Sequence, residues 1–187
     1  MGKYFFAKLA AGAFPLAVQD VAGPAVKALS PFVDDSYRIG TTDAASIGDA
    51  VVQIPARFHF NQPPPARLDL DGEWQLAADC LASRSTDGYL RQAALRRILN
   101  APQPWVIPFI LLPAGEYVVE IAADLIAALP TLDRAIYSDF VRANRPLLRL
   151  LQSRATSYWN CYYRRDYRDK GRYPALAFLW EIESWAA

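Results

Sequence analysis

The residue types that most often perform nucleophilic or metal chemistry are few and scattered in this sequence. It has one histidine, His59, and two cysteines, Cys80 and Cys161. A Cys–His pair would need the fold to join distant positions, and a zinc site needs three or four ligands at a characteristic spacing. The sequence also lacks the glycine-rich loops that bind phosphates and the turn that presents a nucleophilic serine. We therefore expect a surface histidine, two buried thiols, no catalytic or metal site among these residues, and no cofactor.

One group of carboxylates has a spacing that could do chemistry. Glu116, Glu120 and Asp124 stand at i, i+4 and i+8, which is one face of a helix expected over residues 116–129. Such a row could bind a divalent cation or supply an acid/base pair, as in a metal-assisted hydrolase. It could also be the solvated face of an amphipathic helix, or contact a partner protein. A further possibility is pairing with an arginine row on the next helix, formed by Arg142, Arg145 and Arg149.

Large rings and arginines are concentrated between residues 154 and 185. The rings are Tyr158, Trp159, Tyr162, Tyr163, Tyr167, Tyr173, Phe178, Trp180 and Trp185. They fall on more than one side of a helix, which exceeds what a single buried stripe needs. They could fill the core, form a protein interface or stack on single-stranded nucleic acid. If a partner binds here, we expect the contacts to come from Tyr158, Trp159, Tyr163, Arg164, Arg165 and Arg168.

Composition and charge limit the class of protein. The 187 residues are 53% hydrophobic and 21% charged with a net charge of +1, which suits a folded domain without a strong overall field. The charge is uneven, because residues 133–172 hold ten basic and four acidic side chains. The apolar stretch at 105–129 contains prolines and three carboxylates, so we expect no membrane span. The N-terminal apolar run is broken by Lys8 and Pro15, which favours a cytoplasmic protein over an exported one.

The N-terminal third must supply any β structure. Short helices are expected near residues 7–18 and 25–29, and residues 30–49 resemble a surface loop because Asp, Ser, Thr and Gly cluster there. Residues 51–60 alternate apolar and polar side chains, which predicts a half-buried strand, at a sheet edge because of Pro55. We expect residues 1–70 to be an irregular segment carrying that strand, and residues 71–187 to be a helical domain.

Helical patterns dominate after Asp71. Asp71 and Asp87 are candidate N-caps, the second opening a helix over 88–99 with its arginines, Arg91 included, turned outward. A helix over 133–151 should be kinked or split by Pro146, and further helices are expected over 154–165 and 175–185. The expected fold is mainly α: stacked antiparallel helices, either HEAT-like or an irregular bundle, with a small β element in the N-terminal third.

Three strings in the C-terminal half carry a family resemblance. GEYVVEI at 115–121, SYWNCYYR at 157–164 and the Tyr173–Pro174 dipeptide resemble small cytosolic helical proteins found beside bacterial polymorphic toxins. Those proteins are similar to immunity proteins, which bind a cognate toxin and block it. The strings are not a motif with assigned roles, so the resemblance implies a kind of partner and no particular functional residue.

These observations favour a binding protein over an enzyme. The expected function is non-enzymatic protein binding, in the manner of an immunity or antitoxin-like inhibitor that covers a partner's active surface. Nucleic-acid binding through the basic aromatic segment is one alternative, and a metal-assisted hydrolase using the carboxylate row is another.

Overall fold

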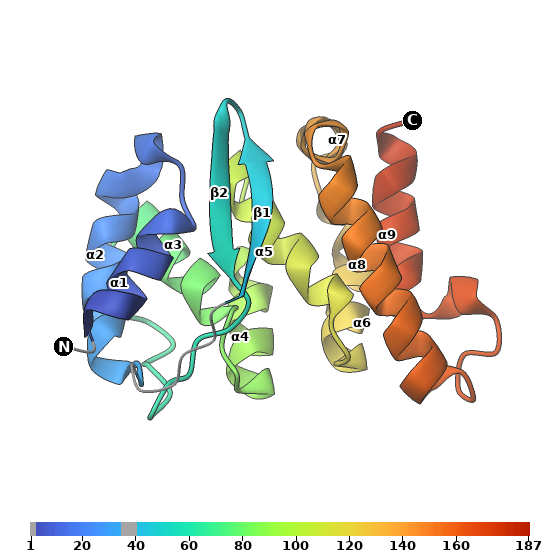
Figure 1. Cartoon of the computed structure of the whole chain (residues 1–187), viewed down its shortest axis with the longest axis horizontal. Helices are drawn as coiled ribbons and strands as arrows, with labels where there is room; N and C mark the ends of the chain where they lie inside the picture. Colours follow the sequence, from blue (N-terminus) through green and yellow to red (C-terminus); the bar gives the residue numbers. More distant parts are fainter. Residues whose placement is uncertain (1–2, 35–40) are drawn as a thin grey trace. The chain divides into compact units, whose positions relative to one another are not determined.

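The structure is mainly helical, with a small antiparallel sheet in the N-terminal third, as the sequence predicts (Figure 1). It is a computed structural model that describes residues 3–34 and 41–187. The chain forms two compact units, residues 1–98 and residues 99–187, which are described separately. The division falls later than the change of character at residue 71, because the two helices that follow residue 71 pack with the first unit.

The described residues of the first unit form four α-helices around an apolar core. They are α1 (Lys3–Gly12), α2 (Gln19–Leu29), α3 (Gly72–Ala82) and α4 (Gly88–Ile98). α1 packs against α2, α2 against α3, and α3 against α4. The core is closed by the ring of Phe6 on α1, which meets Phe58 edge to face with 4.8 Å between centroids. The first helix, expected over residues 7–18, begins and ends earlier, and the second begins well before the expected residue 25. The buried residues of α2, which are Ala22, Ala25, Val26 and Leu29, lie on one helical face.

A two-residue turn connects the strands β1 (Thr42–Ile47) and β2 (Ala50–Pro55) into a hairpin. β1 lies in the stretch predicted to be loop, and that prediction is wrong because its buried face, Asp43 and Ala45, lies opposite Ile54 and Val52 of β2. Residues 35–40 of that predicted loop lie outside the described residues. The turn uses Gly48 with a φ of +56°, a conformation that glycine adopts without steric cost.

The strand predicted over 51–60 is confirmed in its first half only. β2 ends at Pro55, whose nitrogen has no hydrogen to donate to a ladder. Beyond it, Phe58 and Phe60 remain buried and make isolated bridges to Ser85 and Val33. The alternation of apolar and polar residues therefore predicts correctly that Phe58 and Phe60 are buried, although regular strand pairing stops at Pro55.

Two buried polar groups hold the second half of the first unit together. Asp79 on α3 accepts hydrogen bonds from Arg97 of α4, with N···O distances of 2.9 and 2.8 Å. Arg91, predicted to face outward, is only 1% exposed, and this prediction is wrong. Its guanidinium donates a 2.8 Å hydrogen bond to the carbonyl oxygen of Ser85 in the α3–α4 connection. A buried backbone carbonyl needs such a donor, so the arginine is a structural residue.

The second unit is a cluster of helices on an apolar centre. Its helices are α5 (Ile107–Leu111), α6 (Val119–Ala128), α7 (Arg134–Ala143), α8 (Arg145–Tyr158) and α9 (Pro174–Trp185). α9 packs against α6, α7 and α8, and it runs beside α8 in the opposite direction (Figure 1). Its Phe178, Leu179 and Ile182 are buried, so α9 is the central helix of this unit.

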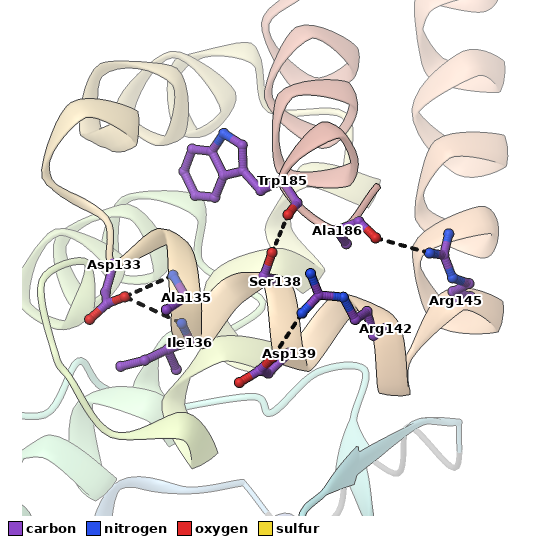
Figure 2. A network of polar contacts seen from close by, with 9 residues as sticks. All are labelled: Asp133, Ala135, Ile136, Ser138, Asp139, Arg142, Arg145, Trp185 and Ala186. Carbon is purple, nitrogen blue, oxygen red and sulfur yellow. Dashed lines mark hydrogen bonds and ion pairs between the residues drawn. The ribbon is translucent and has the colours of Figure 1, made fainter.

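Pro146 splits the helix predicted over 133–151, as expected. α7 ends at Ala143 and α8 begins at Arg145, with Pro146 in the first turn, where its missing N–H costs nothing. Asp133 caps α7 by accepting hydrogen bonds from the backbone N–H groups of Ala135 and Ile136 (Figure 2). The split also separates Arg142 from the other two members of the predicted arginine row.

The arginines at that split serve local contacts. Arg142 pairs with Asp139 of its own helix at 2.9 Å, and Arg145 donates to the carbonyl oxygen of Ala186 at the end of α9 (Figure 2). A cation is favourable at a helix C-terminus because the last carbonyl groups carry partial negative charge. The predicted single face of three arginines is therefore wrong.

Among the described residues, no single helix is long and apolar enough to cross a membrane. One pair, Phe5–Gly12 with Leu16–Phe32, reaches the required length and composition only when its two arms are taken together, and the pair is bent by 114° at the break.

Candidate interaction surface

The aromatic, basic segment forms a lobe at the end of α8. After Tyr158 the helix widens into a π-helical turn, Trp159–Tyr163, and the backbone N–H groups of Asp166 and Tyr167 both donate to the carbonyl oxygen of Tyr163. The chain then reaches α9 through residues 164–172. We call residues 159–172 the basic lobe. Its loop, residues 164–172, projects to one side of the end of α8 (Figure 1). Such π-helical turns are rare and occur frequently at functional sites.

Six tyrosine rings connect the core to the surface of the basic lobe. Neighbouring centroids are 5.3–6.5 Å apart along the series, which is the range of favourable aromatic pairs. Tyr173 at one end is fully buried, whereas Tyr117 at the other end and Tyr162 within the series are 55% and 67% exposed. This tyrosine cluster consists of Tyr117, Tyr158, Tyr162, Tyr163, Tyr167 and Tyr173.

Hydrogen bonds fix the shape of the basic lobe. The Tyr163 hydroxyl donates to the carbonyl oxygen of Tyr117, just before α6. The indole N–H of Trp159 donates to the carbonyl oxygen of Tyr167 at 2.8 Å. Partial burial raises the pKa of Tyr163, and the negative charge of Glu120 adds to this shift. The hydroxyl therefore stays protonated at neutral pH and keeps its role as donor.

The cations of the basic lobe divide into engaged and unengaged groups. Arg164 lies over the Trp159 ring at 5.8 Å, and Lys170 lies over the Trp180 ring at 5.7 Å, both cation–π contacts. Arg172 approaches Asp169 at 3.9 Å. Within residues 3–34 and 41–187, Arg165 and Arg168 have no ion pair or side-chain hydrogen bond, so two exposed guanidiniums are available to a partner.

Two open hollows lie on the basic lobe. The first hollow, of about 740 Å³, is lined by Asn160, Cys161, Tyr162, Arg164, Arg165 and Arg168. The second hollow, of about 400 Å³, is lined by Arg165, Asp166, Tyr167, Arg168, Asp169 and Arg172. Arg165 and Arg168 line both hollows and therefore form the wall between them. The lobe thus offers concave, cationic surface on both sides of that wall.

The carboxylate row predicted over residues 116–124 does not form. Residues 112–115 are a 3₁₀ helix, Glu116 is extended with a φ of −119° and a ψ of 170°, and α6 starts only at Val119. Glu116 is 7% exposed, whereas Glu120 is exposed and Asp124 half-buried on α6. Only the latter two share a helix. In the described residues, no group of three or more His, Cys, Asp or Glu side chains could hold a metal ion.

The other predicted residues have separate environments. His59 shares a 2.9 Å hydrogen bond with the Thr86 hydroxyl. Cys80 is buried, and burial first and the charge of Asp79 second raise the pKa of its thiol, which makes it a poor nucleophile. Cys161 is exposed in the first hollow, so its predicted burial is wrong. The π-helical turn changes which side chains face the core, and α-helical spacing could not reveal that.

The basic lobe brings together most of the partner-contact residues predicted in the C-terminal region. Arg164, Arg165 and Arg168 are exposed, and Tyr158, Trp159 and Tyr163 are half-buried. Sequence reasoning missed Asn160 and Cys161 as lining residues and Tyr117 as a member of the tyrosine cluster. No local signal identifies Tyr117, because its ring neighbour Tyr158 lies at the end of α8, far away in the sequence. No family model, curated protein or solved structure matches this chain.

Proposed function

We propose that this chain is a non-enzymatic protein-binding protein of the immunity or antitoxin-like kind, which covers the active surface of a cognate partner with its basic lobe. The observation that carries the proposal is the pair of unengaged guanidiniums, Arg165 and Arg168, beside the exposed ring of Tyr162. Tyr and Arg are among the residues that most often dominate the binding energy of protein interfaces.

The support beneath these residues favours binding without large rearrangement. The rings of Tyr163 and Tyr173 stack with centroids 5.3 Å apart, and Trp159 is tied to the loop backbone. A surface held in one shape loses less entropy on association than a flexible loop of the same composition. The basic lobe is therefore better described as a preformed docking element than as a disordered tail.

Nucleic-acid binding is the second candidate, and Tyr162 next to three arginines is the observation in its favour. Single-stranded nucleic acid binds grooves whose cations follow the backbone for several nucleotides. In the second hollow, Asp166 and Asp169 alternate with the arginines, which interrupts such a path. A gel shift at low and high salt tests this candidate, since phosphate contacts make affinity fall steeply with salt.

The test of the proposal is capture and neutralisation. Tagged wild-type chain and an Arg165→Glu/Arg168→Glu variant are used to capture partners from the native host. A protein held by the wild type is then expressed in bacteria with and without this chain. We expect the partner to impair growth alone and to be neutralised by the wild type. Failure to capture any protein, or a captured partner whose activity this chain leaves unchanged, would overturn the proposal.

A further inference from the structure

The first hollow differs in charge from its neighbour. Its lining has three arginines, one amide, one thiol and one tyrosine, with no carboxylate among these lining residues. The second hollow contains Asp166 and Asp169 as well as arginines. An anionic group entering the first hollow therefore meets cations and hydrogen-bond donors, whereas in the second hollow it meets charges of both signs.

The wall between the hollows carries two guanidiniums, whose chemistry suits an anion. Arg165 and Arg168 are exposed and line both sides. A guanidinium presents a planar fork of N–H donors that matches the two oxygens of a carboxylate. Asn160 adds an amide to the lining of the first hollow, and its oxygen accepts a 3.4 Å hydrogen bond from Arg164. These guanidinium and amide groups favour an oxyanion and would orient its oxygen atoms.

We propose that the first hollow is a carboxylate-binding site, which receives an acidic segment of the partner protein carrying at least two Asp or Glu side chains. Arg165 and Arg168 bind the carboxylates, and the exposed face of Tyr162 packs on the apolar stem of the same segment. This inference rests on the proposed function and names the chemistry of the partner surface.

The observations favour an acidic protein segment over a nucleic acid. The cationic surface without carboxylates is limited to the first hollow, because Asp166 and Asp169 line the second hollow together with its arginines. A polyphosphate backbone would bring further phosphates against those carboxylates. Nucleic-acid-binding domains usually have a strongly basic stripe and a pI above about 9, whereas the pI of this chain is about 7.7. A short cluster of carboxylates could pair with the arginines of the first hollow without approaching Asp166 and Asp169.

Cys161 provides a reporter inside the first hollow. It is exposed, whereas Cys80, the other cysteine of the chain, is fully buried. Neutral iodoacetamide should therefore alkylate Cys161 in the full-length folded chain and leave Cys80 intact. The rate of this reaction, followed by mass spectrometry, is measured with octaglutamate, octaglutamine or an eight-nucleotide oligothymidylate added. Cys80 serves as the internal control for global unfolding.

We expect octaglutamate to protect Cys161 and octaglutamine to have no effect. At a peptide concentration of about twice its Kd, the alkylation rate should fall roughly threefold, because it scales with the unoccupied fraction. The Arg165→Glu/Arg168→Glu variant should lose this protection. An Arg149→Glu variant, changed at another exposed arginine on α8, should keep it. Lack of protection, equal protection in the double variant, or stronger protection by the oligothymidylate would each overturn the inference.

The inference and the proposed function can fail separately. A neutralised partner that binds the Arg165→Glu/Arg168→Glu variant as tightly as the wild type would keep the inhibitory function, but would remove the carboxylate site and the two arginines as its contacts. Protection by octaglutamate with no protein partner captured would keep the carboxylate site and remove the proposed function. Circular dichroism of both variants checks that the fold is retained.

Discussion

The hydroxyl of Tyr163 donates a hydrogen bond to the backbone carbonyl oxygen of Tyr117, which lies 46 residues earlier in the sequence. The bond joins the π-helical turn after α8 to the chain just before α6. The ring of Tyr117 also meets Tyr158, with 6.0 Å between centroids. The basic lobe is therefore anchored to another part of the second unit, which is distant from it in the sequence.

Removing that hydroxyl tests the anchor. Tyr163→Phe should lower the free energy of unfolding by about 1 kcal/mol, the usual net value of one hydrogen bond. It should also weaken partner binding, because the lobe loses part of its fixed shape. Urea denaturation measures the first effect and calorimetric titration the second. Tyr162→Phe is the matched control, and an equal loss of stability in both variants would contradict the anchoring role.

Tyr162 should matter more for binding than for stability. Its side chain is 67% exposed but meets the rings of Tyr158 and Tyr163, so Tyr162→Ala should lower the free energy of unfolding by about 1 kcal/mol at most. If Tyr162 is a binding hot spot, the same change should cost about 2 kcal/mol of binding free energy. Tyr89→Ala, at an 88% exposed tyrosine of the first unit, is the control and should bind normally. If the Tyr162→Ala variant binds the partner with unchanged affinity, Tyr162 is not part of the binding surface.

Gly115 allows the close approach of the 3₁₀ helix 112–115 to α8. A Cβ at this position would lie 2.7 Å from a methyl carbon of Leu151 and 3.5 Å from its Cα. Gly115→Ala should therefore destabilise the second unit by about 1–3 kcal/mol through overpacking. Gly23→Ala, where a Cβ meets nothing within 4 Å, should be neutral or stabilising. Thermal unfolding of the two variants decides between these expectations.

The ion pair between α3 and α4 should stabilise the first unit. Asp79→Ala leaves the guanidinium of Arg97 without its acceptor, and we expect a loss of about 1–3 kcal/mol. We expect no larger loss of unfolding free energy, because the Arg97 side chain is 32% exposed and therefore partly hydrated. A double-mutant cycle with Arg97→Ala isolates the pair. Additive losses in the two single variants would show that the pair contributes nothing.

Alkaline pH should destabilise the protein through its buried thiol and phenols. Burial raises the pKa of Cys80 above 9.0 and those of Tyr137 and Tyr173 above 10.0. A group with a raised folded-state pKa stabilises the fold below its unfolded-state pKa, and that contribution is lost as the pH rises through the folded-state value. Chemical denaturation should thus give a stability that falls from about pH 9 upward.

A double variant separates the phenols from the thiol. The hydroxyls of Tyr137 and Tyr173 are buried without a hydrogen-bond partner in the part of the chain that the structure describes. Tyr137→Phe/Tyr173→Phe should therefore fold normally at pH 7 and lose less stability between pH 9 and about pH 11 than the wild type. An identical pH dependence would show that these phenols do not titrate during unfolding.

Particular residues show which sequence patterns were reliable. The split at Pro146, the cap at Asp87 and the buried positions Val52 and Ile54 follow from local sterics and hydrogen bonding, so they could be read directly. The other predicted cap, Asp71, precedes α3, but its side chain makes no capping hydrogen bond. β1 was missed because its small and polar residues carry no apolar alternation. Glu116 was misplaced because proline and glycine allow both a helix start and a 3₁₀ turn, and tertiary packing selects between them.

The sequence by itself determined the mainly helical fold, the helix boundaries set by proline and Asp caps, and the concentration of rings and arginines near the C-terminus. Those features depend on neighbours within a few residues. Only the tertiary structure decided which rings are buried, which arginines are unengaged and that Cys161 faces a hollow. These outcomes depend on the π-helical turn and on the contact between Tyr163 and Tyr117, where packing between distant segments outweighs local periodicity.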